Sequence, residues 1–399
     1  MQHQATLIKN LISLPEWKGV AMLWNPNSQR TLLALGAEAW IDANKIDQLD
    51  VQSDWWFGYI SYDYKNKVEN LHHRHEHPMG FAPVQFFKPQ AVISFENKNV
   101  EVLKNSSSVD FDFTLSSSVE SSFHSLVAAT QAKESYIEAV NKLKEHIKWG
   151  NIYEVNYCQT FEANYKAEAP FDLFVKLNDL TEAPYASYLA LGRHHVLCAS
   201  PESFIEKKGS MLYSSPIKGT VKRGATAEED ESLKSFLRND KKEQAENVMI
   251  VDLVRNDLSK VATKNSVEVE ELFGIYSFKT VHHMISTVKC ELKEKTTFAE
   301  ILKALFPMGS MTGAPKISAM NLIDDMEVAS RGVYSGSLGV IYPNGDFDFN
   351  VVIRTLLYDS QLELLRCSVG GAITALCEAE REYEECLLKG KAVMYLPFE

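Results

Sequence analysis

The stretch Pro216-Ile217-Lys218-Gly219-Thr220 places a lysine amine at the end of a strand-like run. Glycine after the lysine permits a tight turn, because it has no Cβ. A neutral lysine amine is a nucleophile that can form a covalent intermediate. Upstream, Glu202 opens another strand-like run, and a hairpin between the two runs would bring a carboxylic acid and the amine towards one patch. The alternative interpretation is a solvated surface charge.

Two predicted helices carry paired carboxylates three residues apart. Glu243 and Glu246 form one pair, and Glu382 and Glu385 form the other. Residues at this spacing share a helix face, so facing helices could offer four carboxylates to a hard divalent cation, which prefers oxygen ligands. The alternative is two solvated helix faces, with Glu385 and Lys389 as an ordinary ion pair between residues four apart.

Three segments could bind an anion. The glycine-rich run 306–316 leads into a helix, where backbone N–H groups and the helix N-terminus favour a negative charge, and Pro315 suits the first helical turn. This run lacks the G-K-[ST] of a P-loop, so a carboxylate is a better guest than a nucleotide. Arg354, after an apolar run, could bind a carboxylate with two hydrogen bonds or form a rim salt bridge. The run Val369–Ile373 offers backbone donors at Gly370 and Gly371.

Composition is that of a globular protein of 399 residues, large enough for two ordinary domains or one large body. There are 41 Lys and Arg against 53 Asp and Glu, a net charge of −12, which argues against a surface for nucleic acid or an anionic membrane. No run of 18 apolar residues and no N-terminal signal sequence is recognisable, and six scattered cysteines show no C-x-x-C pair. We therefore expect a cytoplasmic protein with reduced thiols.

The elements that would position these residues fall into two parts, 1–125 and 126–399. The first part alternates short apolar runs with turns, and the Ser-rich stretch 105–122 is the predicted linker. A capping box at Ser135 and Glu138 predicts a helix that ends at Gly150, with its apolar face at Ile137, Val140, Leu143 and Ile147. Later strands occur singly and in pairs among helices, which favours an α+β class with antiparallel sheet.

Seven motifs in order resemble the chorismate-utilising enzymes. They are Ser-Pro-Glu (200–202), Pro-Ile-Lys-Gly-Thr (216–220), the helix motif 245–258, Gly-Ser-Met-Thr-Gly-Ala-Pro-Lys (309–316), Arg-Gly-Val-Tyr-Ser-Gly (331–336), Val-Val-Ile-Arg-Thr (351–355) and Glu-Tyr-Glu-Glu-Cys-Leu-Leu-Lys (382–389). The run 58–63 resembles a landmark of the family's N-terminal part. The resemblance implies an αββα sandwich of two antiparallel sheets in which both parts of the chain share one body.

Lys218 distinguishes the branches of this family. Anthranilate synthases and isochorismate-type enzymes carry alanine at the matching position, whereas lysine is typical of the large subunit of aminodeoxychorismate synthases, in the para-aminobenzoate branch of folate synthesis. The lysine base of the isochorismate type is replaced here by Glu154, so ammonia, not water, is the expected incoming group. The chain departs from the aminating branches at two positions, with Glu154 in place of glutamine and Lys260 in place of arginine.

The resemblance also implies roles for individual residues. Glu202 would protonate the departing hydroxyl and Lys218 would form a covalent adduct. Magnesium would be held by Glu246 and Glu385, with Glu243 and Glu382 in support. Tyr334, Arg354, Gly371 and Lys389 would hold the enolpyruvyl carboxylate, and His283 matches a site histidine that could equally serve only the core. The substrate-binding set implied is Gly219, Thr220, His283, Ser310, Thr312, Tyr334, Arg354, Gly370, Gly371 and Lys389.

No glutaminase segment of the Cys–His–Glu kind is recognisable in the chain, so the resemblance implies a separate glutamine amidotransferase partner that supplies ammonia. The alternative activity is that of anthranilate synthase component I. An alternative interpretation, outside the enzymes, is a metal-binding or regulatory protein, because four histidines lie within His72–His77. The spacing of these histidines fits no closed structural zinc site. A polar surface loop is the simpler interpretation of that tract.

Overall fold

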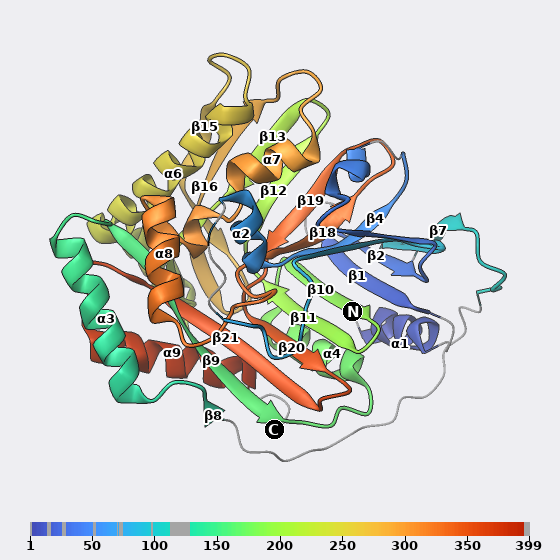
Figure 1. The fold of residues 1–399 in the computed structure, drawn as a ribbon, viewed down its shortest axis with the longest axis horizontal. Helices are drawn as coiled ribbons and strands as arrows, with labels where there is room; N and C mark the ends of the chain where they lie inside the picture. Colours follow the sequence, from blue (N-terminus) through green and yellow to red (C-terminus); the bar gives the residue numbers. More distant parts are fainter. Residues whose placement is uncertain are drawn as a thin grey trace.

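The computed structural model describes residues 2–13, 17–25, 29–50, 53–69, 71, 75–96, 99–111 and 128–394. Two antiparallel β-sheets pack face to face, and helices cover their outer faces (Figure 1). The predicted αββα sandwich is therefore confirmed. None of the described helices combines the length and the apolar character that a membrane span requires.

The first sheet has eleven strands. In spatial order they are β17 (Gly313–Ala314), β9 (Glu154–Asn164), β21 (Leu364–Ile373), β20 (Thr355–Asp359), β11 (His194–Ser200), β10 (Tyr185–Leu191), β1 (Gly19–Asn25), β2 (Arg30–Leu35), β6 (Ala91–Glu96) and β7 (Asn99–Asn105), with β8 (Ala128–Ala129) beside β9. The longest ladder joins β9 and β21, from Leu364 opposite Asn164 to Ile373 opposite Val155.

The second sheet has ten strands. They follow in the order β14 (Ile217–Lys222), β16 (Val281–Glu291), β13 (Met211–Ser215), β12 (Ser203–Lys208), β19 (Phe347–Val351), β18 (Ser337–Ile341), β4 (Trp56–Ile60), β5 (Val84–Lys88) and β3 (Ala39–Asp42), with β15 (Glu268–Ser277) beside β16. Strands from residues before 106 thus lie in both sheets, so the N-terminal residues share the body of the rest. The predicted Ser-rich linker falls largely on residues 112–127, outside the described residues.

The α-helices are α1 (Gln2–Ile12), α2 (Lys65–Val68), α3 (Lys133–Lys148), α4 (Pro170–Thr181), α5 (Ala227–Asn239), α6 (Lys241–Val261), α7 (Phe298–Leu305), α8 (Lys316–Met326) and α9 (Ala379–Met394). Short 3-10 turns are η1 (Ile46–Asp50), η2 (Tyr62–Tyr64) and η3 (Gly309–Met311). Figure 1 shows α3 and α9 alongside β9 and β21, and α6 beside β16 on the other sheet.

Three apolar clusters hold the four layers together. In β1, Val20 and Met22 face the helices of the first sheet, while Ala21 and Leu23 face the second sheet. This alternation follows from the two-residue period of a strand. A third cluster joins α6 and α7 to the second sheet through Val251, among others. Both faces of the central strands are covered, so these strands are apolar on both sides.

The predicted start of helix α3 is wrong. The helix begins at Lys133, with Ala132 as N-cap, and Ser135 lies inside its first turn. The start is set from outside the helix, because Gln131 is held by a hydrogen bond from the Tyr157 hydroxyl at 3.0 Å. The predicted end is confirmed: the helix finishes at Lys148, and Gly150 has a φ of +80°.

Two further local predictions need correction. The predicted hairpin between the run after Glu202 (β12) and the run with Lys218 (β14) is not formed, since β12 pairs with β13 and β14 pairs with β16. Pro315 is the N-cap of α8 and precedes the first helical residue, Lys316.

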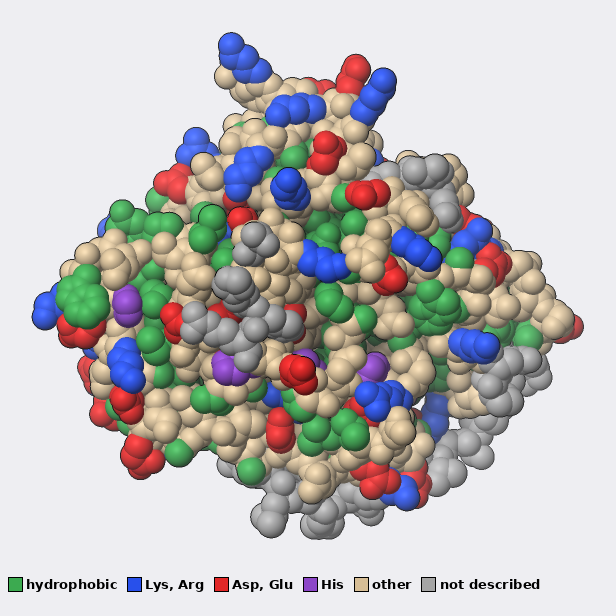
Figure 2. Space-filling view, in the orientation of Figure 1, with side chains coloured by type: hydrophobic (Ala, Val, Ile, Leu, Met, Phe, Trp, Pro, Cys, Tyr) green, Lys and Arg blue, Asp and Glu red, His purple; other side chains and the backbone are tan. Residues whose placement is uncertain are grey.

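Figure 2 shows acidic and basic side chains interspersed over the face it presents, in keeping with a moderate net charge of −12.

Candidate active site

The amine of Lys218 is held between the two sheets. Its Nζ donates a hydrogen bond to Glu154 Oε1 at 2.7 Å, and the side chains of Lys218 and Glu154 are only 12% and 3% exposed. Lys218 belongs to β14 of the second sheet, and Glu154 begins β9 of the first. A second carboxylate oxygen, Glu246 Oε2, lies 4.0 Å from the amine. The lysine is therefore buried among carboxylates, not solvated.

Gly219 permits the irregular backbone conformation next to Lys218. The pairing of β14 with β16 is irregular between Ile217 and Thr220, and Gly219 has a φ of +95°. A Cβ at this glycine would also lie 3.2 Å from Glu243 Oε2. The conformation and the close carboxylate both favour glycine.

Glu202 is a buried carboxyl group with an unusual proton affinity. Burial raises its pKa to about 7, against the smaller opposing effects of hydrogen bonds from the Ser310 hydroxyl and the Ile217 N–H and of the charge on Lys218. Ser310 Oγ lies 2.9 Å from Glu202 Oε1. A carboxyl group that retains its proton near neutral pH can act as a general acid. The predicted proximity of Glu202 and Lys218 is therefore seen in the structure.

His283 lies beside Thr220 of β14, and the charge of Arg354 acts on it. Thr220 Oγ1 and His283 Nδ1 are 2.8 Å apart, while His283 Nε2 is buried with no hydrogen-bond partner in the described chain. Burial, followed by the charge of Arg354, lowers the pKa of His283 to about 3, so the imidazole is neutral.

Arg354 follows β19 and has a φ of +51°, a backbone conformation rare outside glycine. Burial lowers the pKa of Arg354, and its guanidinium makes no hydrogen bond or ion pair to the residues that the structure describes. An unpaired, largely buried guanidinium is suited to an anionic ligand.

The glycine-rich run uses part of its backbone inside the fold. The N–H groups of Met311 and Thr312 donate within the loop, and Gly313 and Ala314 pair with β9. The Thr312 hydroxyl is fully buried and donates to Met308 O at 3.1 Å. The N–H groups of Met311 and Thr312 are therefore used inside the fold, and backbone donors elsewhere in this run stay a prediction. What the loop contributes to the site is the Ser310 hydroxyl.

The second glycine pair lies where β21 has a neighbour on one side only. β20 pairs with β21 as far as Cys367, whereas β9 continues alongside Gly370 and Gly371. The Gly370 carbonyl accepts a hydrogen bond from Lys389 Nζ at 2.9 Å. A Cβ at Gly371 would lie 2.9 Å from Glu382 Oε2. Small residues here let helix α9 approach the strand.

Tyr334 is buried beside β9. Its hydroxyl lies 3.8 Å from the Cys158 sulfur, and burial raises the pKa of the phenol well above its ordinary value. The hydroxyl therefore keeps its proton at neutral pH, and it accepts from the Cys158 thiol.

The four predicted metal-binding carboxylates come from α6 and α9. Burial is the largest cause that raises the pKa of Glu243, and the negative charge of Glu246 raises it further. In the same way, burial and secondly the charge of Glu385 raise the pKa of Glu382. Glu246 also contributes to the raised pKa of Glu382, so charges on the two helices act on each other. In the described chain, no three acidic, histidine or cysteine groups converge as a metal site.

Lysines accompany these carboxylates. Lys242 Nζ lies 3.6 Å from Glu246 Oε1, and Lys389 Nζ lies 2.6 Å from Glu385 Oε1. A hard divalent cation prefers carboxylate oxygens, and it would relieve the repulsion that contributes to the raised pKa of Glu243 and Glu382. The donor chemistry thus fits magnesium.

A buried ion pair below the site was not identified from the sequence. Arg331 Nη2 lies 2.6 Å from Glu327 Oε1, and the same guanidinium donates to the carbonyls of Met311 and Asn156. The pair joins β9 to the loop that carries Ser310. The spacing of four residues between Glu327 and Arg331 predicts an ion pair only on a helix. Both residues lie beyond the last residue of α8, so the sequence offered little indication of this pair.

Two other sequence features lie apart from the site. Lys260 Nζ is 2.7 Å from Asp257 Oδ1, and Lys260 stands about 21 Å along α6 from Glu246 at 1.5 Å per residue. In the histidine tract, His72 and His73 lie outside the described residues, whereas His77 is partly buried and its Nε2 lies 3.0 Å from Arg366 Nη1. The contact with Arg366 gives His77 a role inside the fold.

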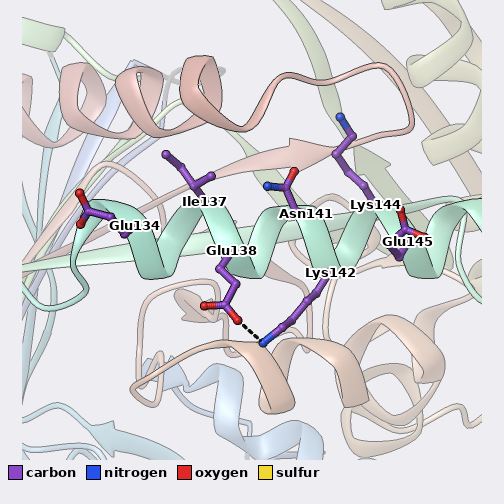
Figure 3. A pocket seen from close by; sticks show the side chains of 7 residues that line it. All are labelled: Glu134, Ile137, Glu138, Asn141, Lys142, Lys144 and Glu145. Atoms are coloured by element: carbon purple, nitrogen blue, oxygen red, sulfur yellow. Dashed lines mark ion pairs between the residues drawn. The ribbon is translucent and has the colours of Figure 1, made fainter.

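A broad surface hollow runs along α3, well apart from Lys218 in the chain (Figure 3). It is lined by one helix, and Glu138 pairs there with Lys142 at 2.7 Å. The predicted capping box placed Glu138 at the start of the helix. In the structure, Glu138 instead forms this ion pair with Lys142.

Comparison with known proteins agrees with this geometry. The profile of the family described as chorismate binding enzyme matches residues 22–395. A probable chloroplastic aminodeoxychorismate synthase of rice (Oryza sativa subsp. japonica) is 41% identical over 72% of this chain, and aminodeoxychorismate synthase component 1 of Escherichia coli (strain K12) is 38% identical over 71%. The chain spans only 32% and 60% of the length of these two proteins.

A solved structure extends the comparison to nearly the whole chain. Anthranilate synthase component I from Streptococcus pneumoniae TIGR4 superposes with a TM-score of 0.78 at 25% identity, covering 96% of this chain and 93% of that one.

Proposed function

This chain belongs to the family of chorismate binding enzymes, and we propose that it is an aminodeoxychorismate synthase component 1, which converts chorismate and ammonia into 4-amino-4-deoxychorismate. The observation that carries this proposal is the buried amine of Lys218 in the electrostatic field of the buried carboxyl group of Glu202. An amine and an acid in one cleft suit a substitution that passes through a covalent lysine adduct.

The steps follow from these two groups. Glu202 gives its proton to the allylic hydroxyl, which leaves as water, while the neutral amine of Lys218 bonds to the ring carbon beside the carboxylate-bearing carbon and the double bonds shift. Ammonia then bonds to the vacated carbon, the double bonds shift back, and the bond to Lys218 breaks. The new ammonium group returns a proton to Glu202, so both residues are restored.

The anionic groups of chorismate would meet the cationic part of the site. Arg354 is the guanidinium without an internal partner, and His283 Nε2 is the buried nitrogen without one. His283 lies beside Thr220, and the charge of Arg354 acts on His283, so the two side chains could bind one carboxylate. Such contacts would orient the ring so that the reacting carbon faces the amine.

Magnesium is the cofactor that we propose for the carboxylates of α6 and α9. Glu246 and Glu385 would hold it, with Glu243 and Glu382 in support. When bound, the ion would neutralise the ring carboxylate of the substrate close to the four glutamates.

Ammonia would come from a separate glutamine amidotransferase subunit. At neutral pH, free ammonia is mostly ammonium, which is not a nucleophile, so a glutaminase docked on this chain would raise the effective concentration of ammonia at the site. The component 1 designation of the E. coli relative is consistent with a two-subunit enzyme. The free thiols of all six cysteines are in keeping with a reducing compartment such as the cytoplasm.

The test is identification of the product by mass spectrometry after incubation with chorismate, magnesium and ammonium. We expect 4-amino-4-deoxychorismate from the wild-type chain and almost none from Lys218→Ala. Without ammonia, wild-type protein should carry a labile mass increment on the peptide that contains Lys218. Fluorescent anthranilate as the product would instead support the anthranilate synthase activity, and full activity in Lys218→Ala would refute the assignment.

A further inference from the structure

We propose that Glu154 is a positioning residue that anchors the buried amine of Lys218 through a hydrogen bond between the two sheets. The proposal rests on the proposed function, in which Lys218 is the nucleophile. What the position must supply is an acceptor oxygen 2.7 Å from Nζ, and not specifically a negative charge.

Lys218 is poorly restrained by its own strand. β14 is the last strand on its side of the second sheet, and its pairing with β16 is irregular on both sides of Lys218, between Ile217 and Thr220. Gly219 follows with a positive φ. The lysine side chain also has about four rotatable bonds, so its amine needs a contact at the far end to stay in one place.

Glu154, by contrast, lies on a well-restrained backbone. It pairs with Ala314 of β17, and its neighbour Val155 has Gly313 on one side and Ile373 of β21 on the other. A Cβ at Gly313 would lie 2.2 Å from the Glu154 carbonyl oxygen, which shows how closely the two backbones approach. The carboxylate therefore extends from a fixed point of the first sheet towards the second.

Glu246 does not provide an equivalent anchor. Its Oε2 is 4.0 Å from Lys218 Nζ, beyond hydrogen-bonding distance, and its Oε1 is 3.6 Å from Lys242 Nζ. Glu202 accepts a hydrogen bond from the Ser310 hydroxyl and acts on Lys218 electrostatically. Among the described residues, Glu154 alone has a hydrogen bond with this amine.

The expected consequence is kinetic. Displacing a reacting group by about 1 Å can reduce a rate about 100-fold, even when the fold is unchanged. Loss of the acceptor should therefore slow adduct formation while leaving chorismate affinity nearly unaltered, because Glu154 contacts the lysine and not the anion-binding residues Arg354 and His283.

The experiment measures adduct formation on Lys218 in the full chain, without ammonia, by rapid quenching and mass spectrometry. Glu154→Gln keeps an acceptor oxygen and should remain within about tenfold of the wild-type rate. Glu154→Leu removes the acceptor at similar size and should lose about 100-fold in rate, with little change in chorismate dissociation constant. Glu154→Ala repeats the test if the leucine variant does not fold, as judged by circular dichroism.

A matched control is Glu162→Gln, which removes a carboxylate from the same strand at its contact with Arg366, 2.7 Å away. It should form the adduct at the wild-type rate. Wild-type rates in Glu154→Leu and Glu154→Ala would overturn the proposal, and so would a glutamine variant as slow as these. Absence of any adduct in the wild-type chain would overturn the proposed function itself, and this proposal with it.

Discussion

Replacing Glu202 with glutamine should change how the stability of the protein depends on pH. In the folded chain, burial raises the pKa of Glu202 to about 7, against an ordinary value of 4.5. The folded state therefore binds the proton more tightly than the unfolded state does. Because the folded pKa is the higher one, the stability that Glu202 contributes is fully present below pH 4.5 and is lost as the pH rises to about 7.

The size of this effect follows from the same two values. A gap of roughly 2.5 pH units, at about 1.4 kcal/mol for each unit, corresponds to about 3 kcal/mol for this fully buried group. Glutamine has nearly the same shape and does not titrate. The free energy of unfolding of Glu202→Gln minus that of wild type should therefore rise by about 3 kcal/mol from pH 4.5 to pH 8, and then remain level.

The assay is urea unfolding of both proteins, followed by tryptophan fluorescence at intervals across this pH range. Asp348, whose pKa burial also raises to about 7, titrates in both proteins and cancels in the difference. A difference that is flat with pH, or that falls as the pH rises, would refute the burial argument. The same variant should form product at least about 100-fold more slowly than wild type, because it has no proton to give.

Three further outcomes follow from the site. Glu246→Gln and Glu385→Gln should each weaken magnesium binding about tenfold or more by titration calorimetry and abolish turnover, with little change in melting temperature; unchanged binding in both variants would exclude the proposed four-carboxylate site. Arg354→Met should raise the KM for chorismate about tenfold or more without loss of folded protein, since the guanidinium has no partner among the described residues; an unchanged KM would mean that the anion binds elsewhere. The purified chain should use ammonium salts at alkaline pH but not glutamine, and efficient glutamine use would contradict the expected amidotransferase subunit.

Local patterns predicted the elements better than their boundaries and pairings. The apolar run of β1 and the glycine after α3 were readable because they depend on neighbours in the chain. The start of α3 was predicted wrongly because contacts to Gln131 from Tyr157 fix the chain before the helix. The partner of β14 could not be read either, since β16 follows some sixty residues later and pairing depends on the whole sheet.

For the site, the sequence by itself determined the chemical groups, the family and the residues on which the proposed reaction depends. The Lys-Gly-Thr turn, the two acidic helix faces and Arg354 could be named because each is a local pattern. Only the tertiary structure decided which of these groups meet. Glu154 stood out in the sequence as a departure, but its hydrogen bond to Lys218 joins residues 64 positions apart on different sheets. The raised pKa of Glu202 likewise arises from burial between packed layers, because desolvation is a property of the assembled fold and not of neighbouring residues.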